Sequence, residues 1–454
     1  MQVDGRRAVV IGLGRSGVAA ARLLLAKGAR VVAADASPRE KFSKDALALE
    51  AEGAELAPGS HGEAALSAAD FVVVSPGVPS FAALVDFERS GREVIGEMEL
   101  ASRFVSAPIA LVGGTNGKST TTALTGAILE AAGLRTFVGG NFGTPLAEVV
   151  GRDVDVLVLE ISSFQAERVP TLHARAHALL NITDDHLDRY PTFDAYAQAK
   201  GNPFVNMTTD DVAVIPYGDA LCARQAQRGR AWAATFSPTD ARATISIDGD
   251  RFVHKGAFVT ATRAAFRLPG LHNVANACAA IGVAAKFLRP AEGPHPAIDA
   301  AFASFTGLDH RTVLVGEKDG VRYYDDSKGT NVGASVTALR GLAEPKAVLI
   351  AGGRDKLGAY EPLVDALRDK GRALVVLGEA ADRIASAAAG VVPIEKAQSM
   401  VEAVNVAREL AQSGDAVLLS PACSSFDMFK DYKDRGDQFA AAVRALLGAP
   451  DAGR

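Results

Sequence analysis

The sequence predicts an α/β protein in which parallel sheets are joined by crossover helices. Apolar segments of four to eight residues alternate with longer Ala- and Leu-rich helical patterns from end to end, which is typical of this fold class. The chain has 454 residues, more than one hydrophobic core usually serves, so we expect several domains. Buried strands are expected at Ala8–Ile11, Val31–Ala34, Phe71–Val74, Ile109–Val112, Val156–Leu159, Ala347–Ile350, Ala373–Leu377 and Ala416–Leu419.

The stretch from Thr244 to Phe266 has a different pattern. Short strands alternate around the turn Asp248-Gly249-Asp250, which predicts antiparallel pairing. A helix around Gly96–Val105 and the segment FTGLDHR, Phe305–Arg311, indicate two domain junctions. We therefore expect three domains, over residues 1–96, 97–307 and 308–454.

The composition excludes several classes of protein. Apolar residues make up 48% and charged residues 22%, as in folded soluble chains, and a net charge of -5 gives no basic surface for nucleic acid. The opening MQVDGRRAVVIGLG does not resemble a signal peptide, and no apolar run reaches the roughly 18 residues of a membrane span. We expect a cytoplasmic protein with no membrane or nucleic-acid partner. Cys222, Cys278 and Cys423 have no metal-ligand spacing and are expected to be reduced core thiols.

The first motif is VVIGLGRSG, Val9–Gly17, a strand that enters a glycine-rich turn before a helix. Glycines permit close backbone approach, and a helix N-terminus attracts phosphate. The motif by itself fits a nicotinamide or flavin dinucleotide site about as well as any other ligand site. The loop SPGVP, Ser75–Pro79, also follows a strand, but alone it indicates only an ordinary turn.

The second motif, GGTNGKST at Gly113–Thr120, is a stronger signal. It follows a strand and precedes a helix, so its amides can hold phosphates, Lys118 can reach the terminal ones, and the Ser119 hydroxyl can bind magnesium. Gly113 and Gly117 enclose three residues, whereas the usual phosphate loop encloses four.

Three further residues lie downstream of this loop. Glu160 ends an apolar strand, where burial of a carboxylate is costly without a metal or a cationic partner. His186, in NITDDHLDRY, would alone be a surface histidine, but the phosphate loop and Glu160 upstream favour a magnesium-linked role. Lys200, in AYAQAKGNP, reads as an exposed helix lysine.

Polar clusters in the final third follow strands or lie in glycine-rich turns. Cations at such places can neutralise charge during phosphoryl transfer, although solvated surface charges would give the same pattern. No histidine is placed to support a serine or cysteine nucleophile in LLSPACSSFDMFKDYKDRG, Leu418–Gly436. The clusters contain Arg311, Asp326, Lys328, Thr330, Asn331 and Lys356.

Taken together, GTNGKST, LEISSFQ, NITDDHLDRY, FTGLDHR, DDSKGTN, AGGRDK and LLSPACSSFDMFK resemble, in this order, the Mur ligase family over essentially the whole chain. The shortened phosphate loop is a feature of that family. The opening GLGRSG with SPG, and the closing SPACSS, are similar to the members that join D-glutamate to UDP-N-acetylmuramoyl-L-alanine.

The resemblance implies a Rossmann-like N-terminal domain that binds the UDP-substrate, a central P-loop domain that binds ATP, and a Rossmann-like C-terminal domain that binds the amino acid. The implied UDP-substrate contacts are Gly14, Arg15, Ser16, Asp35, Ser37, Gly77, Asn141 and His186. The implied ATP contacts are Gly114, Thr115, Asn116, Gly117, Lys118, Ser119, Thr120, Asn273, Asn276, Arg311 and Asp326. The implied D-glutamate contacts are Lys328, Thr330, Lys356, Ser425 and Tyr432.

The resemblance also implies two Mg²⁺ ions, held by Ser119, Glu160, His186 and a carbamylated Lys200. Lys118, His186, Lys200 and Lys328 would be catalytic. Two departures from the family stand out. Lys200 is followed by Gly-Asn-Pro, which should end its helix early, and Tyr432 stands where phenylalanine is often found.

The expected reaction is ATP-dependent amide formation through an acyl phosphate, with ADP and phosphate released. Protection of the acyl phosphate from water predicts closure of the C-terminal domain over the central one, and the expected active species is a monomer. The alternatives are another Mur-type or folylpolyglutamate-type ligase, an NAD-dependent dehydrogenase, and a nucleotide-binding regulatory module without chemistry.

Overall fold

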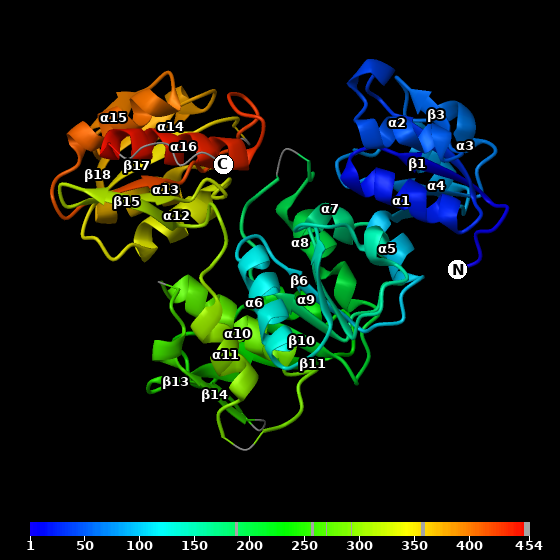
Figure 1. Ribbon diagram of the computed structural model, residues 1–454, viewed down its shortest axis with the longest axis horizontal. Helices are drawn as coiled ribbons and strands as arrows, with labels where there is room; N and C mark the ends of the chain where they lie inside the picture. The colour runs from blue at the N-terminus through cyan, green and yellow to red at the C-terminus, as the bar shows by residue number, and fades with distance from the viewer. Residues whose placement is uncertain (187–188, 256–257, 269, 292, 356–358, 449–454) are drawn as a thin grey trace. The chain divides into compact units, whose positions relative to one another are not determined.

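The structure is a computed structural model that describes residues 1–186, 189–255, 258–268, 270–291, 293–355 and 359–448. These residues form three sheets (Figure 1). The chain packs into two compact units. The first consists of Met1–Ile182, Asp194–Phe266 and Asn276–Ser304, and the second of Thr183–Phe193, Arg267–Ala275 and Phe305–Arg454.

The first sheet is fully parallel, in the order β3-β2-β1-β4-β5. Side chains of β1 alternate between two cores: Ala8 and Val10 pack with α1 on one face, and Val9 and Ile11 pack with α4 on the other. The strands are β1 Arg7–Ile11, β2 Arg30–Asp35, β3 Glu55–Pro58, β4 Phe71–Val74 and β5 Glu93–Gly96. The helices are α1 Arg15–Ala26, η1 Arg39–Lys41, α2 Lys44–Ala51, α3 Glu63–Leu66, α4 Ala82–Arg89 and α5 Glu97–Ser102.

The second sheet has the order β14-β13-β12-β11-β10-β9-β6-β8-β7 and is parallel except at the β12–β14 end. The antiparallel prediction for this end is confirmed, because β12 and β13 pair across a tight turn at Gly249. The strands are β6 Ile109–Gly113, β7 Thr136–Gly140, β8 Val156–Glu160, β9 Ala176–Leu179, β10 Val212–Pro216, β11 Trp232–Phe236, β12 Ile245–Asp248, β13 Arg251–His254 and β14 Phe258–Thr262. The helices are α6 Lys118–Ala131, η2 Leu146–Val149, α7 Ser163–Ala166, α8 Phe193–Gly201, η3 Asn202–Phe204, α9 Ala220–Ala226, η4 Arg263–Ala265, α10 Leu271–Ala284 and α11 Pro296–Ser304.

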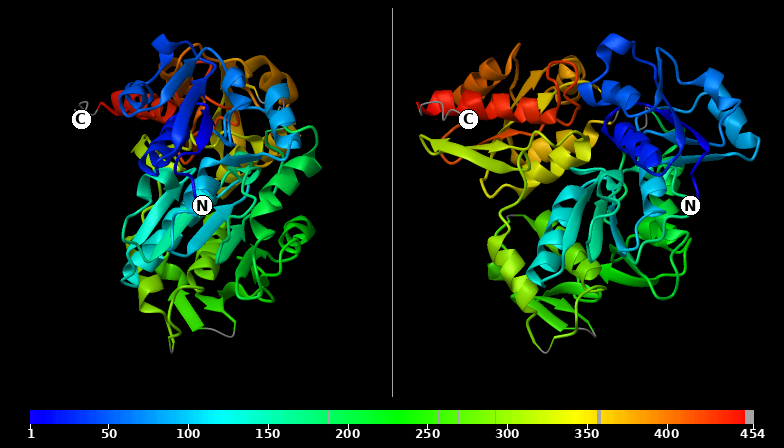
Figure 2. Two further views of the ribbon diagram at one scale, coloured as in Figure 1. Left: turned by 90° about the vertical axis from the view of Figure 1, so that its right-hand side faces the viewer. Right: turned by 45° about the vertical axis from the view of Figure 1, so that its right-hand side comes forward.

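The third sheet has the order β15-β16-β20-β17-β18-β19, with only the β15–β16 pair antiparallel. Leu349 and Ala351 of β17 face the core under α12–α14, and Val348 and Ile350 face α15 and α16, which lie together in Figures 1 and 2. The strands are β15 Val313–Lys318, β16 Val321–Asp325, β17 Ala347–Gly352, β18 Gly371–Leu377, β19 Ile394–Lys396 and β20 Ala416–Leu419. The helices are α12 Val332–Gly341, α13 Glu361–Lys370, α14 Ala381–Ala387, α15 Met400–Leu410 and α16 Tyr432–Leu447.

Strand order decides where a ligand can bind. In open parallel sheets, ligands bind outside the carboxyl ends of the strands where the order reverses. These places are beside β1 and β4 in the first sheet, beside β6 in the second, and beside β16, β20 and β17 in the third. Each of these six strands is followed by a loop that contains predicted site residues.

The α/β class and the eight expected strands are confirmed within a few residues. Cys222, Cys278 and Cys423 are buried free thiols, as expected. None of the helices in the described part of the chain is both long and apolar enough to span a membrane.

Candidate active site

The phosphate loop runs from β6 into α6, and two of its glycines are required by geometry. Gly114 and Gly117 have φ values of 133° and 85°, which L side chains rarely adopt. A Cβ atom at Gly117 would lie 2.4 Å from Asn276 Oδ1. The loop can therefore keep this path only with glycine at position 117.

Asn181 braces the same loop. Its Oδ1 accepts hydrogen bonds from the amides of Thr115 (3.2 Å) and Asn116 (2.8 Å), and its Nδ2 donates to the Asn116 carbonyl (3.1 Å). The sequence prediction did not name Asn181 as a site residue. The signal that could have found it is its position just after β9, which pairs with β6 and so ends at the same edge of the sheet.

The N-terminus of α6 carries Lys118, and the predicted magnesium ligands Ser119 and Glu160 meet there. Lys118 is the first residue of the helix, and its Nζ donates to the Thr115 carbonyl at 2.7 Å. Ser119 Oγ donates to Glu160 Oε2 at 2.5 Å, and Asn141 Nδ2 donates to Glu160 Oε1 at 2.6 Å. The buried carboxylate of Glu160 thus lies directly beside the hydroxyl expected to bind the metal.

The oxygen atoms of Ser119 and Glu160 are suitable ligands for Mg²⁺, which prefers hard oxygen ligands and takes few of them from protein. Among the residues described, no group of three or more His, Cys, Asp or Glu side chains forms a metal cluster. Because Mg²⁺ is octahedral and is usually held through one or two protein groups, an ion at Ser119 and Glu160 would keep positions for phosphate and water oxygens.

Lys200 is not an exposed helix lysine, so that interpretation of the sequence is wrong. The residue is only 5% exposed, and Nζ donates to the Gly114 carbonyl of the phosphate loop at 2.7 Å. The Tyr196 ring lies 4.6 Å from Nζ, and its hydroxyl is 3.0 Å from Thr115 Oγ1. The predicted early end of the helix is confirmed at Gly201, which places Lys200 on the last turn of α8.

The loop after β1 is held by Asp35. Its Oδ2 accepts from the Leu13 amide (2.7 Å) and its Oδ1 from the Ser37 amide (2.8 Å). Burial opposes ionisation, but these hydrogen bonds hold the pKa of Asp35 below its ordinary value. Asp35 and Ser37 therefore act first on the shape of the loop.

The glycines near this loop divide into two kinds. A Cβ at Gly12 or Gly17 would collide with neighbouring atoms at 2.7 Å and 1.8 Å respectively, so both are required by packing. A Cβ at Gly14 or Gly77 would meet nothing within 4 Å. These two predicted UDP-substrate contacts thus face open space, where a ligand can approach the backbone. Ser16 lies half-buried on the first turn of α1.

Arg15 connects the loop after β1 to the segment that follows β7. Its guanidinium donates to the Gly143 carbonyl at 2.8 Å, to Thr144 Oγ1 at 3.2 Å and to Glu148 at 3.3 Å. The same segment carries Asn141. The predicted UDP-substrate residues of the first two sheets are thereby linked.

His186 belongs to the second compact unit. It has a φ of 55°, and its amide donates to Asp185 Oδ1 at 3.0 Å. The other oxygen of Asp185 accepts from Asn331 Nδ2 at 3.1 Å. The neighbouring Asp185 thus connects this loop to the DDSKGTN segment, and the predicted partnership of His186 with Ser119 and Glu160 remains a prediction.

Asp326 is buried at the carboxyl end of β16. Ser420 Oγ donates to its Oδ2 at 2.6 Å and Thr312 Oγ1 to its Oδ1 at 3.2 Å. Burial raises the pKa of Asp326 to about 7, against the opposing effect of these hydrogen bonds and of Arg311. Arg311 thus lies near enough to Asp326 to act on its carboxylate, and their shared contact with ATP remains a prediction.

Lys328 and Tyr432 are adjacent. Lys328 Nζ lies 3.6 Å from the centre of the Tyr432 ring, a cation–π geometry. Lys328 is also tied by its amide to the carbonyl of His310, a residue the sequence prediction did not select. His310 Nδ1 is 2.7 Å from Asp325 Oδ2, and this contact raises the pKa of the imidazole.

The other predicted amino-acid contacts lie on loops after β16 and β20. The Thr330 amide donates to the Lys328 carbonyl at 2.8 Å, and Ser425 is buried. Lys356 lies outside the described residues. Arg435, buried in α16, donates to both Ser327 and the Cys423 carbonyl and so joins the two loops.

Asn273 and Asn276 lie three residues apart on α10 and share one face of that helix. Thr120, the last of the predicted phosphate-loop contacts, is buried in the first turn of α6.

Backbone strain is concentrated at predicted site segments. In the described chain, five non-glycine residues have clearly positive φ. His186 is itself a predicted contact, His310 and Thr312 flank Arg311, and Ala422 lies three positions before Ser425. Such conformations cost about 1–3 kcal/mol each and persist where the surroundings fix them. The strain supports a functional role for these loops.

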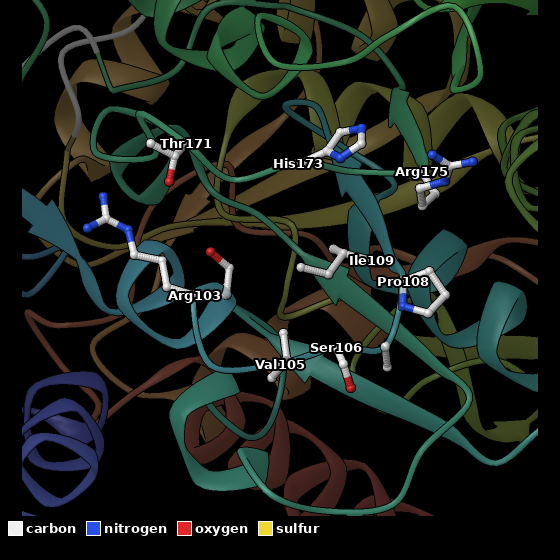
Figure 3. Close-up of a pocket in the computed structure, with 10 residues that line it drawn as sticks. Arg103, Val105, Ser106, Pro108, Ile109, Thr171, His173 and Arg175 are labelled. Atoms are coloured by element: carbon white, nitrogen blue, oxygen red, sulfur yellow. The ribbon is translucent and has the colours of Figure 1, made fainter. Parts of the chain in front are cut away.

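A pocket of about 400 Å³ lies elsewhere, at the amino ends of β6 and β9 (Figure 3). Arg103, His173 and Arg175 line it, but carboxylates balance them: Arg103 contacts Glu93 and Glu99, and the other two contact Asp211. Because it lies at the edge of the sheet opposite the phosphate loop, it is not the nucleotide site.

Three family models match the chain. They are the Mur ligase MurD-like N-terminal domain over residues 6–96, the Mur ligase middle domain over 112–284, and the Mur ligase glutamate ligase domain over 310–423. The three matches follow the order of the three sheets.

Curated relatives are similar over their full length. The UDP-N-acetylmuramoylalanine–D-glutamate ligase of Geotalea daltonii is 42% identical, with 99% of each chain covered. The protein of the same name from Geobacter metallireducens is 44% identical, with 98% of this chain and 99% of the relative covered.

Two solved structures share the fold at low sequence identity. The pseudomurein peptide ligase type C of Methanothermus fervidus has a TM-score of 0.62 at 17% identity, covering 97% of this chain and 100% of that one. The MurF ligase of Thermotoga maritima in complex with ADP has a TM-score of 0.59 at 16% identity, covering 98% and 96%.

Proposed function

The chain belongs to the Mur ligase family, and from this premise we propose that it joins D-glutamate to UDP-N-acetylmuramoyl-L-alanine in peptidoglycan precursor synthesis. ATP supplies the energy and leaves as ADP and phosphate. The observation that carries the proposal is the phosphate loop, in which Lys118 and the Ser119–Glu160 pair lie together at the N-terminus of α6. The choice of D-glutamate is supported by the full-length relatives.

In the first half of the reaction, a carboxylate oxygen of the UDP-substrate attacks the γ-phosphorus of ATP, and ADP leaves. The loop amides and the positive end of α6 attract the phosphates. Lys118 Nζ now donates to a neutral carbonyl, and phosphate oxygens would offer it stronger, charge-assisted hydrogen bonds. Ser119 and Glu160 would hold magnesium, which neutralises phosphate charge when bound.

In the second half, the amine of D-glutamate attacks the acyl carbon, and phosphate leaves. Lys328, stacked on Tyr432, would stabilise negative charge on the tetrahedral intermediate or the substrate carboxylates. Thr330, Ser425 and Lys356 would bind the amino acid. Arg311 and Asp326 would position the ribose and phosphates of ATP, with the adenine on the face of α10 that carries Asn273 and Asn276.

The carbamylation of Lys200 is part of this proposal. Carbamylation turns the ammonium group into a carbamate, which keeps one N–H donor and adds two acceptor oxygens. The hydrogen bond from Nζ to the Gly114 carbonyl, 2.7 Å long, would therefore be retained by the remaining N–H, and the added carboxylate would be the group available to a metal. His186 would be the protein ligand of that second magnesium ion.

We also propose that the enzyme works in the cytoplasm, because ATP and UDP-linked sugars are substrates of that compartment. We further propose that its active species is a monomer. Light scattering should then give the 47.1 kDa mass of a single chain. A larger mass at assay concentration would reject the monomer and leave the reaction unaffected.

The experiment that tests the function measures phosphate release from ATP and Mg²⁺ in the presence of UDP-N-acetylmuramoyl-L-alanine. D-Glutamate is compared with L-glutamate, L-alanine, a diamino acid and no amino acid. Release should require both the UDP-substrate and D-glutamate. Release that depends on another amino acid would reject the proposed specificity. If no amino acid increased phosphate release, the ligase reaction would be rejected.

A further inference from the structure

We propose that Tyr360 is a positioning residue for the amino-acid substrate, because its hydroxyl ties the loop after β17 to the loop after β20 that carries Ser425. The inference rests on the proposed function, since it concerns the binding of D-glutamate. Tyr360 precedes α13 and is 5% exposed. It belongs to the core between the third sheet and helices α12–α14.

The Tyr360 hydroxyl lies between two groups from different loops. It donates to Asp355 Oδ1 at 3.0 Å and lies 3.3 Å from Cys423 Sγ. A tyrosine hydroxyl has one proton, and the carboxylate can only accept. The Cys423 thiol is therefore the donor in the second contact, and the hydrogen bonds run in one direction, from Cys423 through Tyr360 to Asp355.

The acidic end of this chain of hydrogen bonds is anchored by a cation. Arg383 Nη1 donates to Asp355 Oδ2 at 2.7 Å, and the Arg383 guanidinium lies 5.1 Å from the centre of the Tyr360 ring. A charged acceptor strengthens the hydrogen bond from the phenol. Asp355 is thus held in place as the acceptor of the hydrogen bond from the Tyr360 hydroxyl.

The backbone joins the same two loops nearby. The Arg354 amide donates to the Ser424 carbonyl at 2.9 Å, and the Gly352 amide donates to the Pro421 carbonyl at 2.8 Å. These bonds fix how far the loops approach. The contact between the Tyr360 hydroxyl and Cys423 Sγ adds a side-chain connection to these backbone bonds.

Cys423 lies between a strained residue and the predicted substrate contact. Ala422 has a φ of 60°, and Ser425 follows two positions after Cys423. On its other side, the Cys423 carbonyl accepts from Arg435 Nη1 at 3.1 Å. Backbone bonds at Ala422 and Ser424 also hold this segment, so loss of the Tyr360 hydroxyl would release the contact at Cys423 Sγ and leave the others in place.

A second buried tyrosine provides a matched control. Tyr323 of β16 lies in the same compact unit and is fully buried, yet its hydroxyl has no hydrogen-bond partner among the described residues. Tyr323→Phe and Tyr360→Phe each delete one buried hydroxyl from this unit. Only Tyr360→Phe also deletes a connection between the loops.

The test compares steady-state constants for all three substrates. Tyr360→Phe should raise the KM for D-glutamate about three- to tenfold, the range for one lost hydrogen bond, with the KM values for ATP and the UDP-substrate changed less than about twofold. Cys423→Ala should do the same from the other end of the contact, and supplies the test if Tyr360→Phe does not fold. Tyr323→Phe should leave all three constants unchanged.

Equal changes in all three KM values, or no change in that for D-glutamate, would overturn the inference. So would the same D-glutamate effect in Tyr323→Phe. Failure of the proposed function is distinguishable, because the unmodified enzyme would then show no release that depends on D-glutamate.

Discussion

The phosphate loop and the loops of the third sheet are both at the carboxyl ends of parallel strands, but they are built in different ways. The phosphate loop is one continuous segment, shaped by glycines of positive φ and braced by Asn181. The predicted amino-acid site is assembled from loops after β16, β17 and β20, joined by the side chains of Arg435 and Tyr360.

This difference teaches where each site is sensitive. A site made from one backbone segment depends on a few geometrically irreplaceable residues, and their loss should abolish the chemistry. A site made from side chains on several loops can lose one contact and retain the others. We therefore expect large, general effects from the phosphate loop and graded effects, specific to D-glutamate, from the third sheet.

The largest expected effect is that of Lys118→Ala. Removal of the cation from the phosphate loop should lower kcat for the reaction with D-glutamate on the order of 10³-fold. Lys44→Ala is the matched control, because Lys44 is also the first residue of a helix but is exposed on α2. If Lys118→Ala retained more than a tenth of the activity, the loop would not be the site of phosphoryl transfer.

The next effect separates backbone strain from steric conflict. Gly117→Ala should weaken ATP binding about tenfold or more, because the methyl group meets Asn276 in addition to an unfavourable φ of 85°. Gly133→Ala provides the comparison, since φ there is 83° and its Cβ would meet nothing within 4 Å. Isothermal titration with a non-hydrolysable ATP analogue measures both. Equal losses of ATP affinity in the two variants would mean that the positive φ, and not the contact with Asn276, accounts for the glycine at position 117.

A smaller effect should appear at Tyr432. Tyr432→Leu removes the ring beneath Lys328 Nζ and should raise the KM for D-glutamate about three- to tenfold, leaving that for ATP unchanged. Tyr432→Phe keeps the ring and should change neither constant by more than about twofold. A large effect of Tyr432→Phe would instead assign the contribution to the hydroxyl.

The smallest catalytic effect is expected away from both loops, at Glu97. This buried residue accepts from the Ala147 amide at 2.6 Å, and burial raises its pKa to about 7. Because the folded pKa lies above the ordinary one, its stabilising contribution is present at acidic pH and is lost as pH rises through about 7.

Glu97→Gln removes that loss. The difference in melting temperature, Glu97→Gln minus the unmodified protein, should therefore increase as the pH is raised from 5 to 8.5. The increase should be equivalent to about 1–3 kcal/mol of unfolding free energy, with kcat unchanged at pH 7. Melting curves across this range measure the difference. A constant difference at all pH values would show that Glu97 does not titrate there.

The sequence was most informative where one segment determines both structure and chemistry. The strand, glycine-rich loop and helix of the phosphate site could be predicted because all of their determinants lie within Gly113–Thr120. At Glu160 the sequence indicated a buried carboxylate in need of a partner; the structure shows the Ser119 hydroxyl and the Asn141 amide there, and the expected metal or cation remains a prediction.

Residues whose roles depend on distant neighbours could not be predicted in this way. Lys200 is buried only because α8 ends against the Gly114 carbonyl, 86 positions away, and its local sequence does not show this. The same is true of Asn181 and Tyr360, whose hydrogen-bond partners lie on other strands or loops. Tertiary packing, and not local pattern, selects these side chains.

The central claim is that ATP activates a carboxylate for attack by D-glutamate, and isotope transfer tests it most directly. UDP-N-acetylmuramoyl-L-alanine with both oxygens of its alanyl carboxylate labelled as ¹⁸O is incubated with the enzyme, ATP, Mg²⁺ and D-glutamate, and the released phosphate is analysed by mass spectrometry. Because the leaving phosphate takes the carboxylate oxygen that attacked the γ-phosphorus, each phosphate should contain one ¹⁸O atom. Amide product accompanied by unlabelled phosphate would contradict the acyl-phosphate mechanism.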